Sequence, residues 1–301
     1  MTRIGFIGVG TMGLPMARNL VKGGFAVTAY DTNAEAVKAA AGAGMTAAAA
    51  TVEAVATADL VVTMLPSSSH VQSVYAGDGG VLAAARKGTL CVDMSTIDPA
   101  VSRQVAAAAA ERGLRFLDAP VSGGVPRATD GTLAIMVGGA KADFDEAFPV
   151  LSAMGANVIH VGPVGSGEVV KLCNNLIAGV AAVAISEAFR IAEGFGVDPK
   201  VVTDVIAKSS GHTWVMEHMH PVPALVPQAA STNGYRPGFM TDLMCKDLGL
   251  AVDAARALRV PVFVSPAAQQ LYRLASSHGL GRKDFTSVYT LLVPSAEQAP
   301  V

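Results

Sequence analysis

Residues 3–31 have the sequence RIGFIGVGTMGLPMARNLVKGGFAVTAYD. An apolar strand pattern from Arg3 to Gly8 leads into a Gly-x-Gly-x-x-Gly loop, and a helical pattern follows from Leu14 to Lys22. A second strand pattern, Phe25 to Tyr30, ends at the acidic residue Asp31. This order of strand, glycine loop, helix, strand and acid predicts a unit that binds a dinucleotide.

The glycine loop has a distinct expected role at each position. Gly8 is expected to permit the tight turn, Gly10 to let the backbone approach a pyrophosphate, and Gly13 to allow close packing of helix against strand. Thr11 and Met12 complete the loop, where unpaired N–H groups and the helix dipole favour the cofactor's phosphates.

Asp31 is expected to select the cofactor. Its carboxylate would accept hydrogen bonds from the adenosine ribose hydroxyls and repel a 2′-phosphate. The next residues, Thr32 and Asn33, supply no arginine for such a phosphate. The sequence therefore predicts NAD rather than NADP as the cofactor.

Strand and helix patterns continue to alternate through the first half of the chain, which predicts a parallel, doubly wound α/β sheet of the Rossmann type. In such sheets ligands bind beyond the carboxyl ends of the strands. Polar or Gly/Pro-bearing segments fall at four such ends: 8–13, 65–66, 93–96 and 118–124. The further expected strands are Asp59–Met64, Gly88–Asp93, Arg115–Leu117, Thr132–Val137 and Asn157–Val161.

These segments leave alternatives open. Leu65 and Pro66 would pack against the cofactor. Thr96 is expected either to contact the cofactor's ribose or only to precede a helix that starts near Pro99, and both can hold. Residues 122–124, Ser-Gly-Gly, form either a site for a substrate carboxylate or a plain glycine turn.

Residues 162–175, GPVGSGEVVKLCNN, begin a long helix that is expected to run to about Gly194. Lys171 and Asn175 lie one turn apart and share a face, with Asn174 beside them. Gly167, one turn before Lys171, has no side chain and would let another group approach the backbone. Without the rest of the chain, a solvated lysine at a helix start explains the same pattern.

The second half of the chain has no strand alternation and is expected to be all helical. The predicted domains are therefore 1–163, which binds the dinucleotide, and 164–301, which contains the long helix and a helical substrate or dimerisation domain. The expected helices after the long one are Pro199–Lys208, Met240–Leu258 and Pro266–Gly279.

Composition argues against several other functions. The chain has 301 residues, a net charge of −2 and no basic run, so a nucleic-acid partner is not expected. Three dispersed cysteines indicate a reducing compartment, and the absence of a targeting pattern favours the cytoplasm. The longest later uncharged run, Leu172 to Ser186, is expected to be too short and too polar to span a membrane.

No metal site is expected. His212, His218 and His220 lie close together in the sequence, but their spacing does not converge on one point, and no carboxylate or cysteine completes a ligand set.

The chain resembles the β-hydroxyacid dehydrogenase family over its whole length. The motifs that carry the resemblance are GFIGVGTMGLPMARNL (5–20), DMSTIDP (93–99), DAPVSGG (118–124), GPVGSGEVVKLCNN (162–175), GYRPGFMTDLMCKDLGLA (234–251) and KDFTSV (283–288). The last two of these, together with SSGHTW (209–214), are more typical of the branch that oxidises 3-hydroxyisobutyrate.

The resemblance implies a role for individual residues. Lys171 would transfer protons. Ser122, Gly123, Gly124 and Asn175 would hold the substrate. Apart from the resemblance, Trp214, Tyr235 and Phe239 are expected to be either the apolar side of the pocket or core aromatics. Leu65, Pro66, Thr96 and Lys246 would contact the cofactor. His70 stands where related enzymes often carry Asn, which puts its cofactor contact in doubt. A lysine with a pKa near 10.4 is a poor base at pH 7, but burial and a nearby cation lower the pKa of such a group.

The implied reaction is the NAD-dependent oxidation of 3-hydroxyisobutyrate to methylmalonate semialdehyde, a step of valine catabolism, by a homodimer or homotetramer. Two kinds of alternative remain. One is another reaction of the same fold, such as tartronate semialdehyde reduction or imine reduction, and imine-reducing relatives replace the lysine. The other is a non-catalytic dinucleotide-binding module.

Overall fold

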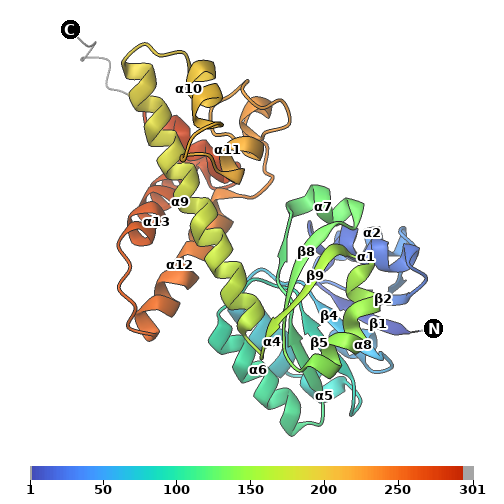
Figure 1. Cartoon of the computed structure of the whole chain (residues 1–301). Helices are drawn as coiled ribbons and strands as arrows, with labels where there is room; N and C mark the ends of the chain where they lie inside the picture. The colour runs from blue at the N-terminus through green and yellow to red at the C-terminus, as the bar shows by residue number, and fades with distance from the viewer. Residues whose placement is uncertain (1, 294–301) are drawn as a thin grey trace. The chain divides into compact units, whose positions relative to one another are not determined.

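The computed structural model describes residues 2–293 (Figure 1). The chain divides into two compact units, Met1–Lys171 and Leu172–Val301, and each is described by itself. The boundary lies within the long helix α9 (Ser166–Gly194). The boundary expected from the sequence, between residues 163 and 164, precedes this helix.

The first unit alternates strands and helices. Its strands are β1 (Arg3–Ile7), β2 (Ala26–Tyr30), β3 (Thr46–Ala47), β4 (Leu60–Thr63), β5 (Leu90–Asp93), β6 (Arg115–Asp118), β7 (Val121–Ser122), β8 (Leu133–Gly138) and β9 (Gly155–Gly162). Its helices before α9 are α1 (Gly13–Lys22), α2 (Ala34–Ala41), α3 (Thr51–Val55), α4 (Ser68–Ala76), α5 (Val81–Ala84), α6 (Pro99–Glu111), α7 (Gly124–Asp130) and α8 (Lys141–Ser152).

The central sheet is parallel, as the sequence predicts. The strand order is β3-β2-β1-β4-β5-β6-β8-β7, with β9 paired to β8, and every neighbouring pair from β3 to β6 is parallel. The expectation of a wholly parallel sheet is wrong at one edge, because β8 runs antiparallel to both β6 and β7. β7 continues in the direction of β6, and the chain reverses between β7 and β8, where α7 has only seven residues, too few for a right-handed crossover.

Helices cover both faces of the sheet, as expected for a doubly wound fold (Figure 1). Alternate residues of the strands enter two separate cores. In β4, Leu60 and Val62 pack with α1 and α8, whereas Val61 packs with α3, α4 and α6. This period-two alternation, with both sides apolar, accounts for the nearly continuous apolar strand sequences.

The second unit is all helical among its described residues, as predicted. Aside from its part of α9, it contains α10 (Pro199–Ile206), α11 (Trp214–His218), η1 (Ser231–Asn233), α12 (Thr241–Ala257), α13 (Val264–Ala275), η2 (Ser276–Leu280) and η3 (Phe285–Leu291). One core joins α9, α12, α13 and η3, and it includes Phe189, Met244, Leu248 and Tyr272. The Tyr272 hydroxyl donates to the carbonyl oxygen of Gly179 at 2.9 Å, which fixes α13 against α9.

The helix α9 passes a simple test for a membrane span. Among the described residues it alone is long and apolar enough to cross a membrane by length and composition, because the helix extends beyond the run Leu172–Ser186 that was expected to be too short and too polar. This is weak evidence for a span, because core helices pass the same test. Ala182 and Phe189 of α9 are buried in the core of the second unit, which accounts for much of its apolar character.

His220 is buried as a neutral side chain. Its Nδ1 accepts a hydrogen bond from the Val222 backbone N–H at 3.1 Å, and its ring packs edge-on against Phe189. Burial lowers the pKa of His220 to about 4. Its imidazole therefore belongs to the packing of the second unit.

We predict that His220 makes stability fall in mild acid. Between pH 6.5 and 4, His220 is protonated in the unfolded chain but stays neutral in the folded protein. The free energy of unfolding therefore decreases by up to roughly 3 kcal/mol as the pH falls through this window. His220→Asn keeps an acceptor but does not titrate. Urea unfolding at pH 7 and 4.5 should give a smaller loss for the variant, and equal losses would contradict the prediction.

Candidate active site

The glycine loop follows β1 and is shaped by backbone packing. Gly8 has φ +91°, and a Cβ there would lie 2.2 Å from the Met64 carbonyl oxygen. A Cβ on Gly13 would lie 1.9 Å from the Gly8 carbonyl oxygen, so α1 can approach β1 this closely only without a side chain. A Cβ on Gly10 would meet no heavy atom within 4 Å. The loop is therefore open at Gly10, as binding of a pyrophosphate against its backbone requires.

A pocket of about 310 Å³ lies beside Asp31. The Asp31 Oδ1 accepts the backbone N–H of Asn33 at 2.8 Å, which leaves its other oxygen available to a ligand's hydroxyl group. The pocket suits the adenosine half of a dinucleotide, since the carboxylate stands at the end of β2, next to the glycine loop. Its lining residues are Tyr30, Asp31, Thr32, Ala34, Val37, Ala48 and Ala49.

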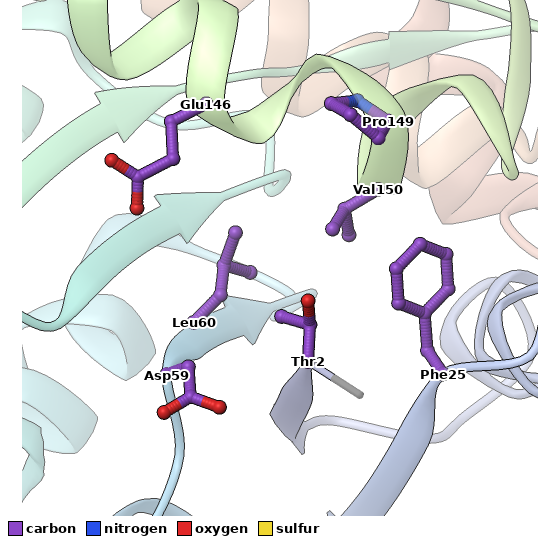
Figure 2. A pocket seen from close by; sticks show the side chains of 7 residues that line it. All are labelled: Thr2, Phe25, Asp59, Leu60, Glu146, Pro149 and Val150. Carbon is purple, nitrogen blue, oxygen red and sulfur yellow. The ribbon is translucent and has the colours of Figure 1, made fainter.

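A second pocket, of about 340 Å³, lies at the opposite edge of the sheet, where β1 and β4 begin (Figure 2). Its two carboxylates, Asp59 and Glu146, are held by arginines: Asp59 pairs with Arg3 and Arg86, and Glu146 pairs with Arg115. Because ligands of this fold bind at the carboxyl ends of the strands, this pocket is not the candidate site.

The carboxyl ends of the central strands form one row. The pairing register joins Ile7 to Thr63, Thr63 to Asp93, and Asp93 to Asp118, the last residues of β1, β4, β5 and β6. The four loops that follow therefore start side by side, which confirms the prediction that these segments gather at one edge.

A buried network beneath this edge centres on Asp93. The Asp93 Oδ1 accepts hydrogen bonds from the hydroxyl groups of Thr63 at 2.7 Å and Ser95 at 2.6 Å. The Ser95 Oγ in turn accepts the Leu65 backbone N–H at 2.8 Å. Burial raises the pKa of Asp93 to about 6. The network links the end of β5 to the segment that carries Leu65.

Asp118 caps the long helix. Its Oδ1 accepts the Gly165 N–H at 2.6 Å and its Oδ2 accepts the Glu168 N–H at 3.0 Å. A Cβ on Gly167 would lie 2.3 Å from the Met136 carbonyl oxygen and 2.8 Å from Asp118 Oδ2. The expectation that Gly167 lets another group approach the backbone is therefore confirmed, and the approaching groups belong to the protein's own sheet.

Lys171 is withdrawn from solvent. Its residue is only 5% exposed, which excludes the reading of a solvated lysine at a helix start. Glu168, one turn earlier on α9, is completely buried, and its Oε2 accepts the Ile97 backbone N–H at 3.1 Å. The start of α9 is thus attached to the loop after β5 and to the end of β6.

In the second unit, Asp247 joins two of the predicted site residues. Its Oδ2 accepts the Asn175 Nδ2–H at 2.6 Å, and its Oδ1 lies 3.2 Å from the Lys246 Nζ. Asn174 donates to the Asn175 side-chain oxygen at 3.0 Å. The Asn175 amide is therefore held from both sides, and α9 places it one turn from Lys171.

Comparisons with known proteins decide the family. Residues 3–162 match the family described as "NAD binding domain of 6-phosphogluconate dehydrogenase", and residues 165–292 match "NAD-binding of NADP-dependent 3-hydroxyisobutyrate dehydrogenase". The chain is 42% identical over 291 residues to the mitochondrial 3-hydroxyisobutyrate dehydrogenase of Rattus norvegicus, covering 97% of this chain and 87% of that protein.

The chain belongs to the β-hydroxyacid dehydrogenase family. It is also 42% identical over 298 residues to the NAD-dependent L-serine dehydrogenase of Pseudomonas aeruginosa, covering 99% of this chain and all of that protein. The solved structure of the Mycobacterium tuberculosis 3-hydroxyisobutyrate dehydrogenase with L-serine is similar over 97% of this chain and 99% of that one, with 42% identity and a TM-score of 0.92. The β-hydroxyacid dehydrogenase described here is an NAD-binding oxidoreductase that acts on a CH–OH group.

The remaining predicted site residues of the first unit of this dehydrogenase lie in the loops after its strands. Thr96 is half-buried just before α6, whose start Asp98 caps by accepting the Ala100 N–H, so the helix-start alternative is confirmed. Pro66 and His70 are exposed, and the His70 Nδ1 lies 2.7 Å from the Ser67 Oγ. The Ser122–Gly124 segment ends β7 and begins α7, with Gly123 at φ +134°.

Two of the aromatic candidates differ. Trp214 is 55% exposed and stacks on His218, whereas Phe239 packs edge-on against Phe285 at the border of the core. The core alternative therefore describes Phe239 well, and Trp214 keeps a free face.

Three buried carboxylates, Asp93, Asp118 and Glu168, were not predicted as site residues. Asp93 and Asp118 carried a signal, since each is an acid at the last position of an apolar strand. Glu168 carried none beyond its place one turn before Lys171.

Proposed function

We propose that this dehydrogenase oxidises 3-hydroxyisobutyrate to methylmalonate semialdehyde with NAD, and that Lys171 is its general acid and base. The observation that carries the proposal is the burial of Lys171, which is 5% exposed on a helix capped by Asp118 at the end of β6. Burial withdraws the ammonium group from bulk water, which is the kind of environment in which active sites place their acids and bases. The location at the carboxyl edge of the sheet is where such a fold binds its ligands.

In this mechanism the chain handles the proton. NAD, when bound, supplies the acceptor for the hydride that leaves the hydroxyl-bearing carbon. Lys171 takes the proton from the substrate hydroxyl oxygen in oxidation and returns it to the carbonyl oxygen in reduction. Asn175, held by Asp247, orients the substrate oxygen, and the Ser122 hydroxyl with the Gly123 and Gly124 N–H groups binds the carboxylate.

The cofactor would lie along the carboxyl edge of the sheet. Its pyrophosphate would rest on Gly10, Thr11 and Met12, and Asp31 would bind the adenosine ribose. Leu65, Pro66 and Thr96 would contact the nicotinamide half, with Lys246 as a further contact and His70 as a weaker one. Support comes from the open space at Gly10 and the pocket beside Asp31.

We predict that Asp31 sets the preference for NAD over NADP. Asp31→Asn keeps an oxygen for the Asn33 N–H but removes the charge that repels a 2′-phosphate. The ratio of kcat/KM with NAD to kcat/KM with NADP should fall about tenfold, with little change in the free energy of unfolding. An unchanged ratio would show that the charge of Asp31 does not face the ribose.

L-serine is the second candidate substrate, since the chain is as similar to an NAD-dependent L-serine dehydrogenase as to the 3-hydroxyisobutyrate enzymes. Both substrates share a carboxylate and a 3-hydroxyl group and differ in a methyl or an ammonium group at C2. Initial rates with 3-hydroxyisobutyrate, serine, glycerate and 3-hydroxypropionate, with NAD and NADP in turn, test the proposal. A higher kcat/KM for serine would replace the first candidate, and a higher value for glycerate would favour tartronate semialdehyde reduction.

A homo-oligomer in the cytoplasm remains our expectation for the working enzyme. The oligomer is supported by the apolar surface of the second unit, where Phe195 is 80% exposed and Phe263 is 84% exposed. Light scattering coupled to size exclusion would give the oligomer number directly.

A further inference from the structure

Two buried carboxylates attach the first turn of α9 to the end of β6 and to the loop after β5. Asp118, at the end of β6, accepts the N–H groups of Gly165 and Glu168 at 2.6 and 3.0 Å. The Glu168 side chain then reaches the loop after β5, where its Oε2 accepts the Ile97 N–H at 3.1 Å. All of these groups belong to the first unit.

The contact between Glu168 and Ile97 joins the loop that is expected to bind the cofactor to the helix that carries Lys171. Ile97 directly follows Thr96, the expected ribose contact, and Lys171 lies one helical turn after Glu168 on the same face. We propose that Glu168 is a positioning residue that holds the cofactor-binding loop after β5 in register with the helix that carries Lys171. The proposal rests on the proposed function and names a further residue for it.

Neither helix needs the Glu168 carboxylate for its own start. The first N–H groups of α9 are already accepted by Asp118, and α6 begins with Asp98 as its cap and Pro99 in its first turn. Burying a carboxylate completely is costly, and an apolar side chain of similar length would avoid this cost. The contact with Ile97 N–H therefore has a consequence other than helix capping, which is the relative placement of the loop and α9.

Two variants of equal length separate the hydrogen-bond acceptor of Glu168 from its charge. Glu168→Gln keeps a side-chain oxygen that can accept the Ile97 N–H, whereas Glu168→Met fills the same space without an acceptor. Glu187→Gln makes the same change at an exposed position of α9 and serves as the control. Each protein is assayed well below its melting temperature, with kcat, KM for NAD and KM for the 3-hydroxy acid expressed per folded molecule.

We expect Glu168→Gln to stay within about threefold of the wild type in kcat and in KM for NAD. Glu168→Met should lose at least about tenfold in kcat and should raise the Kd for NAD by about threefold or more. The reason is that small misplacements of reacting groups are costly. Wild-type kcat and Kd in Glu168→Met would overturn the proposal. Equal losses in the Gln and Met variants would also overturn it, since the charge and not the hydrogen bond would then be responsible.

Two further measurements keep the outcome decisive. If Glu168→Met does not fold, Glu168→Asn takes its place, because its amide is one methylene too short to reach the Ile97 N–H and the same losses are expected. The Kd for NAD is measured by calorimetry without substrate. If the wild type oxidises none of the 3-hydroxy acids, the proposed function fails while weakened NAD binding in Glu168→Met still supports the tie.

Discussion

Replacing Lys171 by methionine should lower kcat by about 10²- to 10⁴-fold, because the hydroxyl proton then has no positioned acceptor. Methionine keeps the length and the apolar stem of lysine, so the buried position stays filled. The Kd for NAD should stay within about threefold of the wild type, since the expected pyrophosphate and ribose contacts lie in other segments. Initial rates with saturating NAD and calorimetry without substrate give the two quantities.

A matched control lies two residues along the same helix. Cys173 is an exposed residue of α9, and Cys173→Ala should leave both kcat and the Kd for NAD unchanged. Turnover in Lys171→Met comparable to the wild type would exclude this lysine as the acid and base. Loss of NAD binding together with turnover would instead assign Lys171 to the cofactor site.

The second large effect is expected in the glycine loop, where Gly13→Ala should lower the stability of the fold and Gly10→Ala should weaken the binding of NAD. Gly13→Ala would place a Cβ 1.9 Å from the Gly8 carbonyl oxygen, and no flexible side chain can yield there. We expect the free energy of unfolding to fall by about 3 kcal/mol, at the upper end of what overpacking costs. Urea unfolding monitored by circular dichroism measures it.

Gly10→Ala is the counterpart of that variant, because a Cβ at Gly10 meets no heavy atom within 4 Å. Its free energy of unfolding should remain within about 0.5 kcal/mol of the wild type. The Kd for NAD should rise about tenfold or more, since the methyl group stands where the pyrophosphate must approach the backbone. If Gly10→Ala binds NAD normally, the pyrophosphate does not lie against this glycine.

Local patterns in the chain were sufficient for much of the architecture. The glycine loop, the acid at Asp31 and the apolar strands predicted the parallel centre of the sheet, because spacing and alternation act within one element. The reversal at β7 and β8 was not predicted. Only the short α7 distinguishes it from a crossover, and a seven-residue helix leaves a weak periodic signal.

Residue types at fixed spacing along single elements were enough to predict the family and the NAD cofactor and to single out Lys171 as the proposed acid and base. The surroundings of these residues depend on the tertiary structure. It showed that Gly167 makes room for Asp118 and Met136 rather than for a ligand, and that Glu168 reaches the N–H of Ile97. Contacts of this kind join residues from separate strands and helices, so they depend on how the elements pack and leave no periodic trace in the chain.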